Sequence, residues 1–241
     1  MTDLLDIRGK RIAVVADPHL SFLSPEEVAA FSVQLKQLEG VDAFVCLGDL
    51  FDFWLGPGNW DLPPFQPLKL AFTSLSQAGV QVLFVRGNRD VLLEPRDVEC
   101  VGGVVLDALI GGSHSSPVLL SHGDEYCLAD IPYQRLRKNF RRPWLRAILR
   151  TLPWRLRFWL GCRMRKLSTS AIARKPMESM AINDDAVREA CEAASCQSAW
   201  IGHLHLAATR TLHGGISLKI LPAWEPGTPF ETLELESVTP S

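Results

Sequence analysis

The sequence of 241 residues predicts a layered α/β domain that carries a helical insertion. Two observations predict this class. Apolar runs typical of buried strands alternate with helical periodicity along the first half of the chain. That rhythm stops near residue 130 and strand patterns resume only near residue 198, so we expect residues 130–195 to be helices inserted into one domain that spans residues 1–241.

Seven apolar runs are the expected strands. They are nearly continuous in hydrophobic residues rather than alternating, which is typical of strands that are covered on both faces. They comprise residues 11–17, 41–48, 80–87, 117–122, 198–204, 217–223 and 230–236. The opening has the order β-α-β-α-β, which favours a parallel sheet with right-handed crossovers.

Two helices are expected between the first three strands. Ser24 suits the N-cap of the first, Pro25 suits its first helical position, and its apolar residues recur on one face. The second covers residues 65–78 and is ended by Gly79. Within the insertion, helix starts or breaks are expected at three prolines: Pro143, Pro153 and Pro176.

The composition is that of an ordinary globular protein, with 47% hydrophobic and 22% charged residues. The only early apolar run, residues 12–16, is too short for the core of a signal peptide, and no run approaches the roughly 20 apolar residues of a membrane span. The six cysteines are scattered without a C-x-x-C pair, which favours a reducing compartment. We therefore expect a cytoplasmic protein.

The net charge of −2 hides a strongly basic segment. Residues 135–176 contain 14 Lys or Arg and no Asp or Glu, which leaves 11 basic and 27 acidic groups elsewhere. Trp144, Trp154, Phe158 and Trp159 stand among these arginines, a pattern typical of helices that meet an anionic membrane surface. Nucleic-acid binding and a merely solvated basic face over packed apolar residues are the alternatives. We expect a membrane partner and no nucleic acid.

Side chains that bind metal ions follow five of the expected strands. In layered α/β folds, ligands bind at the carboxyl ends of the strands. The candidates are Asp17, His19, Asp49, Asn88, His122, His203 and His205. Oxygen and nitrogen donors without thiolates suit manganese, magnesium, iron or zinc. A single histidine on a strand is more often a core residue and a single Gly-Asp more often a turn, so the prediction depends on the whole set, and His114 and His213 receive no role.

The order of these blocks resembles the calcineurin-like metallophosphoesterase family: D-x-H, GD-x-x-D, GN-x-D, HGD and GH-x-H. The resemblance implies a four-layer α/β/β/α sandwich with two ions at the strand ends. It implies that one ion is held by Asp17, His19, Asp49 and His205, and the other by Asp49, Asn88, His122 and His203. Asp49, Asn88 and His122 are then also catalytic. Asp52 and Asp124 are candidates for orienting the ligands, or equally surface or cap residues.

Arg89 departs from the wider family, many members of which have a histidine in this position after the asparagine. That histidine helps to protonate the leaving group, whereas arginine stays charged, grips phosphate oxygens and is a poor acid. We expect a catalytic Arg89 that serves a leaving group needing little protonation, such as a nucleoside monophosphate leaving a diphosphate. The alternative is that Arg89 only pairs with Asp90.

Longer blocks extend the resemblance over nearly the whole chain, insertion included. GDLFDFWLG, GNRDVLL, HGDEYCLAD, RRPWL, RMRKLS and LPAWEPG resemble the UDP-2,3-diacylglucosamine hydrolases of lipid A biosynthesis. This implies a manganese enzyme at the inner membrane that splits the pyrophosphate of a UDP-linked diacylated sugar into UMP and the sugar 1-phosphate. Its substrate contacts would be Asn88, Arg89, Asp130, Ser168, Lys175 and His203. Ile172 and Leu206 differ from the usual Asn and Arg, which leaves the exact sugar lipid open.

Two other functions stay open on the sequence alone. A phosphodiesterase or nuclease of the same family would use the same donor set. A metal-free scaffold that binds protein partners would be expected to have lost donors, and all seven are present. Release of UMP from the lipid-linked nucleotide, compared with hydrolysis of single-stranded DNA, would separate the two enzymes.

Overall fold

The computed structural model describes residues 4–172 and 181–234, except for the side chains of residues 164–172. One sheet contains four parallel strands, β2 (Ile12–Val15), β3 (Ala43–Cys46), β4 (Gln81–Val85) and β5 (Gly103–Leu106). An antiparallel strand, β11 (Glu231–Leu233), adds to its edge and gives the order β11-β2-β3-β4-β5.

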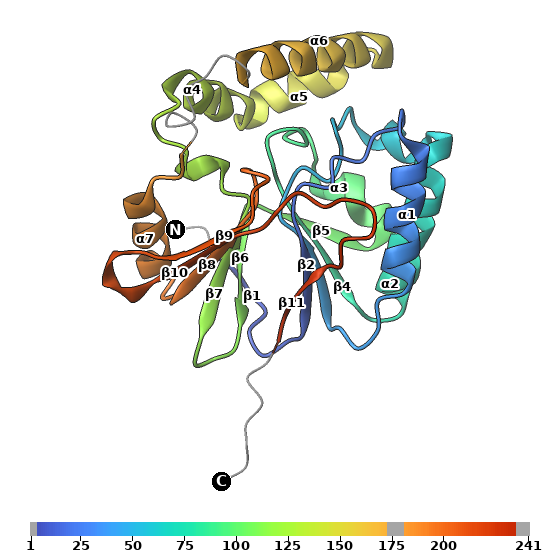
Figure 1. Ribbon diagram of the computed structural model, residues 1–241. Coiled ribbons are helices and arrows are strands. Elements are labelled where there is room, and N and C mark those ends of the chain that lie inside the picture. The colour runs from blue at the N-terminus through green and yellow to red at the C-terminus, as the bar shows by residue number, and fades with distance from the viewer. Residues whose placement is uncertain (1–3, 173–180, 235–241) are drawn as a thin grey trace.

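The second sheet is mixed. Its strands are β1 (Leu5–Asp6), β6 (Ala108–Gly112), β7 (Pro117–Ser121), β8 (Ser198–Ile201), β9 (Ala208–Thr211) and β10 (Ser217–Ile220). They lie in the order β1-β6-β7-β8-β10-β9, and β7, β8 and β10 run parallel. The two sheets pack face to face (Figure 1).

Alternation along β2 shows how the layers arise. Ile12 and Val14 point into the core between the sheets, whereas Ala13 and Val15 point to the other face. Helices α1 (Pro25–Lys36) and α2 (Gln66–Gln77) cover that other face, and α7 (Asp184–Ala193) covers the outer face of the second sheet. The four layers are therefore α/β/β/α, and the predicted sandwich is confirmed.

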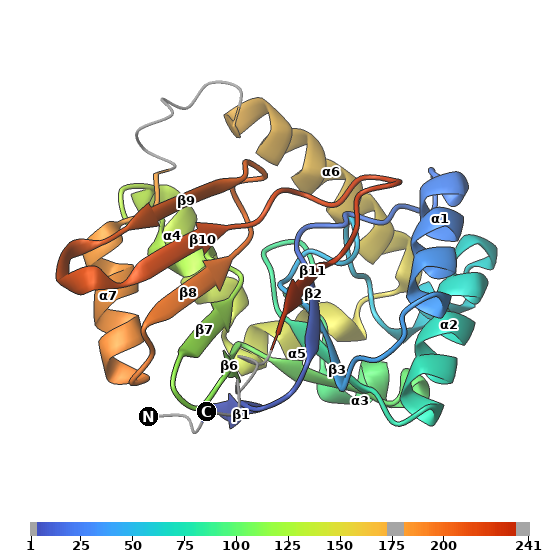
Figure 2. The ribbon, with the colours of Figure 1, turned by 60° about the horizontal axis from the view of Figure 1, so that its bottom comes forward.

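The helices α4 (Ile131–Phe140), α5 (Pro143–Thr151) and α6 (Trp154–Ile172) lie together beyond one edge of the two sheets (Figures 1 and 2). Pro143 is the first residue of α5 and Pro153 separates α5 from α6, while Pro176 lies outside the described residues. Helix α7 also falls within residues 130–195, but it packs as a layer of the sandwich. None of the described helices is long and apolar enough to cross a membrane.

Short helices connect the larger elements in the described part of the chain. They are α3 (Pro95–Val98), η1 (Pro57–Asp61), η2 (Pro63–Phe65), η3 (Glu99–Val101), η4 (Asp124–Tyr126) and η6 (His213–Gly215). Ser24 occupies the N-cap of α1 as expected, but its side chain makes no capping hydrogen bond.

The expected strands were too long at their carboxyl ends, and four strands had no strong signal. β2 ends at Val15 and β8 at Ile201, because the residues that follow turn into loops. The unexpected strands are β1, β5, β6 and β9. β1 has only two residues, β5 and β6 contain glycines, and β9 is a largely exposed polar edge strand, so their sequences resemble loops.

Candidate metal centre

The loops after five strands carry the predicted metal donors to one edge of the sandwich. Asp17 and His19 follow β2, Asp49 follows β3, Asn88 follows β4, His122 follows β7, and His203 and His205 follow β8. Because these strands run parallel within their sheets, their carboxyl ends meet at the same edge. The structure brings all seven side chains together there.

One group of donors is formed by Asp17, His19 and His205. Their ligand atoms lie within 4.8 Å of one another. The Nε2 atoms of His19 and His205 are 3.0 Å apart, and Nε2 of His205 lies 3.8 Å from Oδ1 of Asp17. Three donors from two loops therefore converge on a volume the size of one ion.

A second group surrounds Asn88. Its Oδ1 atom lies 3.1 Å from Nε2 of His122 and 3.1 Å from Nδ1 of His203. Nδ1 of His122 lies 2.8 Å from the carbonyl oxygen of Leu47, an arrangement in which Nδ1 donates the hydrogen bond and Nε2 is free to bind a metal.

Asp49 lies between the two groups. Its Oδ2 is 3.9 Å from Nδ1 of His19, and its Oδ1 is 3.9 Å from Nε2 of His122. Asp17 is also close to both groups, because its carboxylate clusters with Asp49 and His122 as well as with His19 and His205. Two carboxylates are therefore placed where a ligand shared by two ions would lie.

The backbone at the donors is unusual. Asp17, His19, Asp49, His203 and His205 all have positive φ angles, between 48° and 69°. Non-glycine residues seldom adopt this left-handed region, and it persists only where the surrounding structure fixes it. β2 and β8 end at Val15 and Ile201, so these donors lie in left-handed turns that follow the strands at the shared edge.

Three glycines make room for donors from other strands. A Cβ atom on Gly48 would collide with the ring of His122, and one on Gly87 would collide with the carboxylate of Asp49. On Gly202 it would stand 2.5 Å from Oδ2 of Asp17. The glycines of the Gly-Asp, Gly-Asn and Gly-His blocks thus permit the close approach of neighbouring loops.

The buried acids and imidazoles of this cluster shift one another's pKa values. Burial and the neighbouring Asp49 raise the pKa of Asp17 to about 7, although His122 opposes this. Burial lowers the pKa of His19 to about 2 and of His203 to about 3. For His122 burial acts in the same direction, but the carboxylates of Asp49 and Asp17 outweigh it and raise the pKa to about 9.

Two buried donor atoms also have no hydrogen-bond partner among the described residues, Oδ1 of Asp17 and Nδ1 of His19. Buried polar atoms are normally satisfied, and an unsatisfied one in a carboxylate–imidazole cluster indicates a missing ligand. Orphaned donors, oxygen and nitrogen chemistry and crowded carboxylates all fit divalent cations.

Arg89 faces this centre. Its backbone N–H donates to Oδ1 of Asp49 at 2.8 Å, and its Nη1 donates to Oδ1 of Asp52 at 2.6 Å. The alternative in which Arg89 pairs with Asp90 is wrong, because the Asp90 carboxylate accepts from the backbone N–H groups of Gly87 and Leu50. Asp52 therefore orients the guanidinium, and Asp90 holds the loops that carry Asp49 and Asn88.

Asp124 connects the centre to the insertion. Its Oδ2 accepts from Oη of Tyr133 and from Nε of Arg137, both at 2.6 Å, and the ring of Tyr133 stacks on His203 with centroids 6.1 Å apart. The sequence does not predict the contacts of Tyr133 and Arg137 with Asp124, because these contacts depend on how α4 folds back over the site.

Of the remaining expected substrate contacts, the structure describes the side chain of Asp130 but not those of Ser168 and Lys175. Asp130 is buried and caps α4, with Oδ1 accepting from the N–H of Tyr133 at 3.2 Å. Ser168 lies in α6 but its side chain is outside the described part, and Lys175 is outside the described residues altogether. Leu206, which departs from the family pattern, is exposed.

Known proteins match this chain over most of its length. The sequence model of the calcineurin-like phosphoesterase family matches residues 10–207. A UDP-2,3-diacylglucosamine hydrolase of Aeromonas salmonicida is 34% identical over 86% of this chain and 83% of its own. Those of Actinobacillus succinogenes and Escherichia coli O7:K1 are 31% and 34% identical, over 94% and 82% of this chain and 94% and 83% of their own. The chain therefore belongs to the calcineurin-like phosphoesterase family and is a hydrolase.

Proposed function

We propose that this protein hydrolyses the pyrophosphate bond of UDP-2,3-diacylglucosamine and releases UMP and 2,3-diacylglucosamine 1-phosphate in lipid A biosynthesis. The observation that carries the proposal is the similarity to hydrolases of that name over more than four-fifths of the chain. The position of Arg89 beside the donor cluster supports it from the structure.

The seven donors would hold two divalent ions, for which manganese is our proposal and magnesium, iron or zinc share the donor chemistry. Asp17, His19, Asp49 and His205 would hold one, and Asp49, Asn88, His122 and His203 the other. When bound, such ions neutralise phosphate charge and lower the pKa of a coordinated water.

Arg89 would grip the phosphate oxygens. Its side chain is 29% exposed, while that of its partner Asp52 is 4% exposed. The buried carboxylate therefore orients the guanidinium, and part of the guanidinium stays accessible to a ligand. Attack at the α-phosphorus would place the oxygen of water on UMP and release the sugar 1-phosphate. That leaving group, like UMP, needs little protonation, which suits an arginine where a general acid would otherwise stand.

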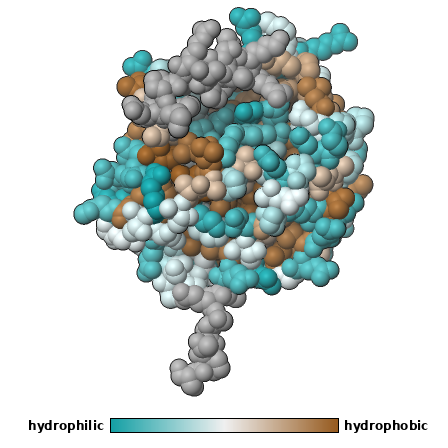
Figure 3. Space-filling model, in the orientation of Figure 1, coloured by the Kyte–Doolittle hydropathy of each residue, from teal (hydrophilic) through white to brown (hydrophobic). Residues whose placement is uncertain are grey.

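The insertion would bind the lipid part of the substrate and the surface of the inner membrane. Trp144, Ile148, Leu156 and Trp159 are each more than 40% exposed, on helices that are otherwise rich in arginine. In Figure 3 several hydrophobic patches lie among hydrophilic residues on the face below these helices. Each basic residue near an anionic membrane contributes roughly 1 kcal/mol, so a few suffice for reversible, peripheral binding.

The test is hydrolysis of the lipid-linked nucleotide by the metal-loaded protein in water labelled with ¹⁸O. We expect UMP that carries the label and depends on added divalent metal. Single-stranded DNA and a chromogenic phosphodiester serve as comparison substrates for a nuclease or general phosphodiesterase. Faster turnover of either would contradict the proposal, and label in the sugar phosphate would contradict attack at the α-phosphorus.

A further inference from the structure

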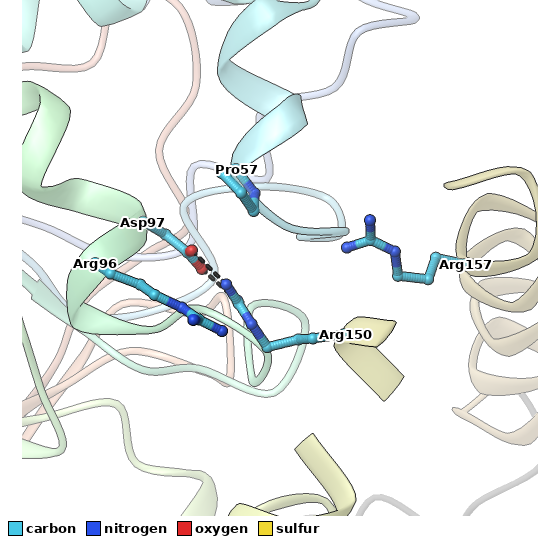
Figure 4. Close-up of a pocket in the computed structure, with 5 residues that line it drawn as sticks. All are labelled: Pro57, Arg96, Asp97, Arg150 and Arg157. Atoms are coloured by element: carbon cyan, nitrogen blue, oxygen red, sulfur yellow. Dashed lines mark hydrogen bonds and ion pairs between the residues drawn. The ribbon is translucent and has the colours of Figure 1, made fainter. Parts of the chain in front are cut away.

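A cavity of about 350 Å³ lies between the insertion and the sandwich, away from the seven metal donors. It is lined by Pro57 of η1, Arg96 and Asp97 of α3, Arg150 of α5 and Arg157 of α6. Figure 4 shows Arg157 reaching toward the other charged side chains from the opposite side of the space. Three guanidinium groups from three elements thus face one carboxylate.

That carboxylate is already occupied. Asp97 is 1% exposed, and its two oxygens accept from Nη1 and Nη2 of Arg150 at 2.5 and 2.6 Å. Oδ2 also accepts from Nε1 of Trp54 at 3.0 Å. The pair fixes the guanidinium of Arg150 at the cavity wall and neutralises only that one charge.

Two positive charges in the cavity are left without a counterion. Arg96 is exposed and makes no hydrogen bond or ion pair with any residue that the structure describes. Arg157 donates from Nη1 to the carbonyl oxygen of Leu55, while its Nε is buried without a partner in the same part of the chain. Burial and the nearby charge of Arg150 lower the pKa of Arg157, although Asp97 opposes this, and the guanidinium also lies over the ring of Trp154 at 5.7 Å from its centroid.

We propose that this cavity binds a phosphate monoester group, which Arg96 and Arg157 neutralise while Arg150 supplies a third, prepositioned cation. The planar fork of arginine matches the oxygens of phosphate, and charge-assisted hydrogen bonds of this kind are strong. The cavity volume falls within the range of small-molecule sites, so the phosphate would be attached to a larger body. The shared chemistry has two sources, the headgroup of an anionic lipid such as phosphatidic acid and a soluble phosphorylated metabolite.

The site can be tested with glycerol 1-phosphate, titrated into the metal-loaded full chain by calorimetry. Binding at the metal centre is common to all variants, so differences between them report the cavity. Arg96→Gln and Arg157→Gln should each weaken one binding step about tenfold, the effect of losing one charge-assisted hydrogen bond. Arg155→Gln is the matched control, because Arg155 is an exposed residue of α6 that does not line the cavity; it should change binding less than about twofold.

Vesicles identify the source of the phosphate. Co-sedimentation is measured with phosphatidylcholine vesicles that contain or lack phosphatidic acid. If the arginine variants lose binding both to glycerol 1-phosphate and to vesicles with phosphatidic acid, the ligand is a lipid headgroup. If they lose binding to glycerol 1-phosphate alone, the ligand is a soluble phosphate monoester. Wild-type behaviour of the Arg96→Gln, Arg157→Gln double variant in both assays overturns the proposal. Folding does not obscure the result, because the Arg96 side chain has no described partner whose loss could destabilise the protein.

Discussion

The candidate metal centre and the insertion are held in place by different forces. Asp17 and His122 are completely buried at the ends of strands whose side chains fill two cores. By contrast, none of the described side chains of α4 or α5 is fully buried, and large apolar residues there face outward. The centre is fixed by close packing, whereas α4 and α5 are attached mainly by charged hydrogen bonds, and Phe158 of α6 packs against Phe22 and Phe53.

Two buried carboxylates of the sandwich make that attachment. Asp124 accepts from Tyr133 and Arg137 of α4, and Asp97 accepts from Arg150 of α5. Removing one partner of such a buried pair leaves the other charge uncompensated and costs about 3–5 kcal/mol, so the attachment is sensitive to the loss of either side chain. The difference teaches that the candidate metal centre is built into the closely packed part, whereas the insertion, for which we propose a role in lipid binding, is held by fewer contacts.

The largest effect is expected from removing a donor of the centre. His122→Ala or Asn88→Ala should lower kcat by about 1,000-fold or more, since even one group that stabilises the transition state is worth 10²–10³. The fold should persist because the layers pack without these side chains. The measurement is UMP release with circular dichroism as a check on folding, and His213→Ala, an exposed histidine, is the control. Full activity in either donor variant would contradict the assignment.

Alanine substitutions at two glycines with nearly equal φ angles can separate the effect of steric contact at the centre from the effect of backbone strain. Gly48 has φ of 90° and abuts the ring of His122, whereas Gly79 has φ of 89° and open space around it. Gly48→Ala should displace His122 and reduce metal occupancy and turnover by about 100-fold. Gly79→Ala should cost only about 1–2 kcal/mol of stability. Equal metal content in the two variants, measured by elemental analysis, would show that close approach is unimportant here.

The sequence predicted the centre better than the elements that surround it. The donors carry strong signals because Asp, Asn and His seldom follow apolar strands in such numbers, and the parallel connections bring their loops to one edge. The four missed strands had weak signals, because pairing with neighbours stabilises β1, β5, β6 and β9 more than their own residues do.

What the sequence could not predict is contact across long separations. Tyr133 lies beside His203 and Asp97 beside Arg150 only because the insertion folds back over the sandwich. The left-handed turns at Asp17 and His203 were equally hidden, since neither residue type requires a positive φ. Those turns end the strands before the donors, which is why the predicted strands ran too far.

A smaller effect is expected where the insertion meets the centre. Asp124→Asn removes the negative charge of the carboxylate to which Tyr133 and Arg137 of α4 donate hydrogen bonds, so α4 should move away from His203. We expect KM for the lipid-linked substrate to rise about tenfold while metal content stays unchanged, as for loss of a group that only positions substrate. Asp107→Asn is the control, because Asp107 is an exposed carboxylate that pairs with Arg86 and with Arg141 of the insertion but lies outside the donor cluster. A fall in metal content would instead place Asp124 within the centre.

The smallest expected effect is the number of protons that the protein releases when it binds a metal ion. In the metal-free protein His122, with its pKa raised to about 9, is protonated at neutral pH, whereas His19 and His203 are already neutral because their pKa values are lowered. A metal ion requires neutral imidazole, so binding at a pH of about 7.5 should release about one proton, and affinity should increase with pH until His122 loses its proton unaided. Calorimetry of manganese binding in buffers of different ionisation enthalpy measures this number. If no proton is released, the ion does not displace a proton from His122, and His122 does not belong to the second group of donors.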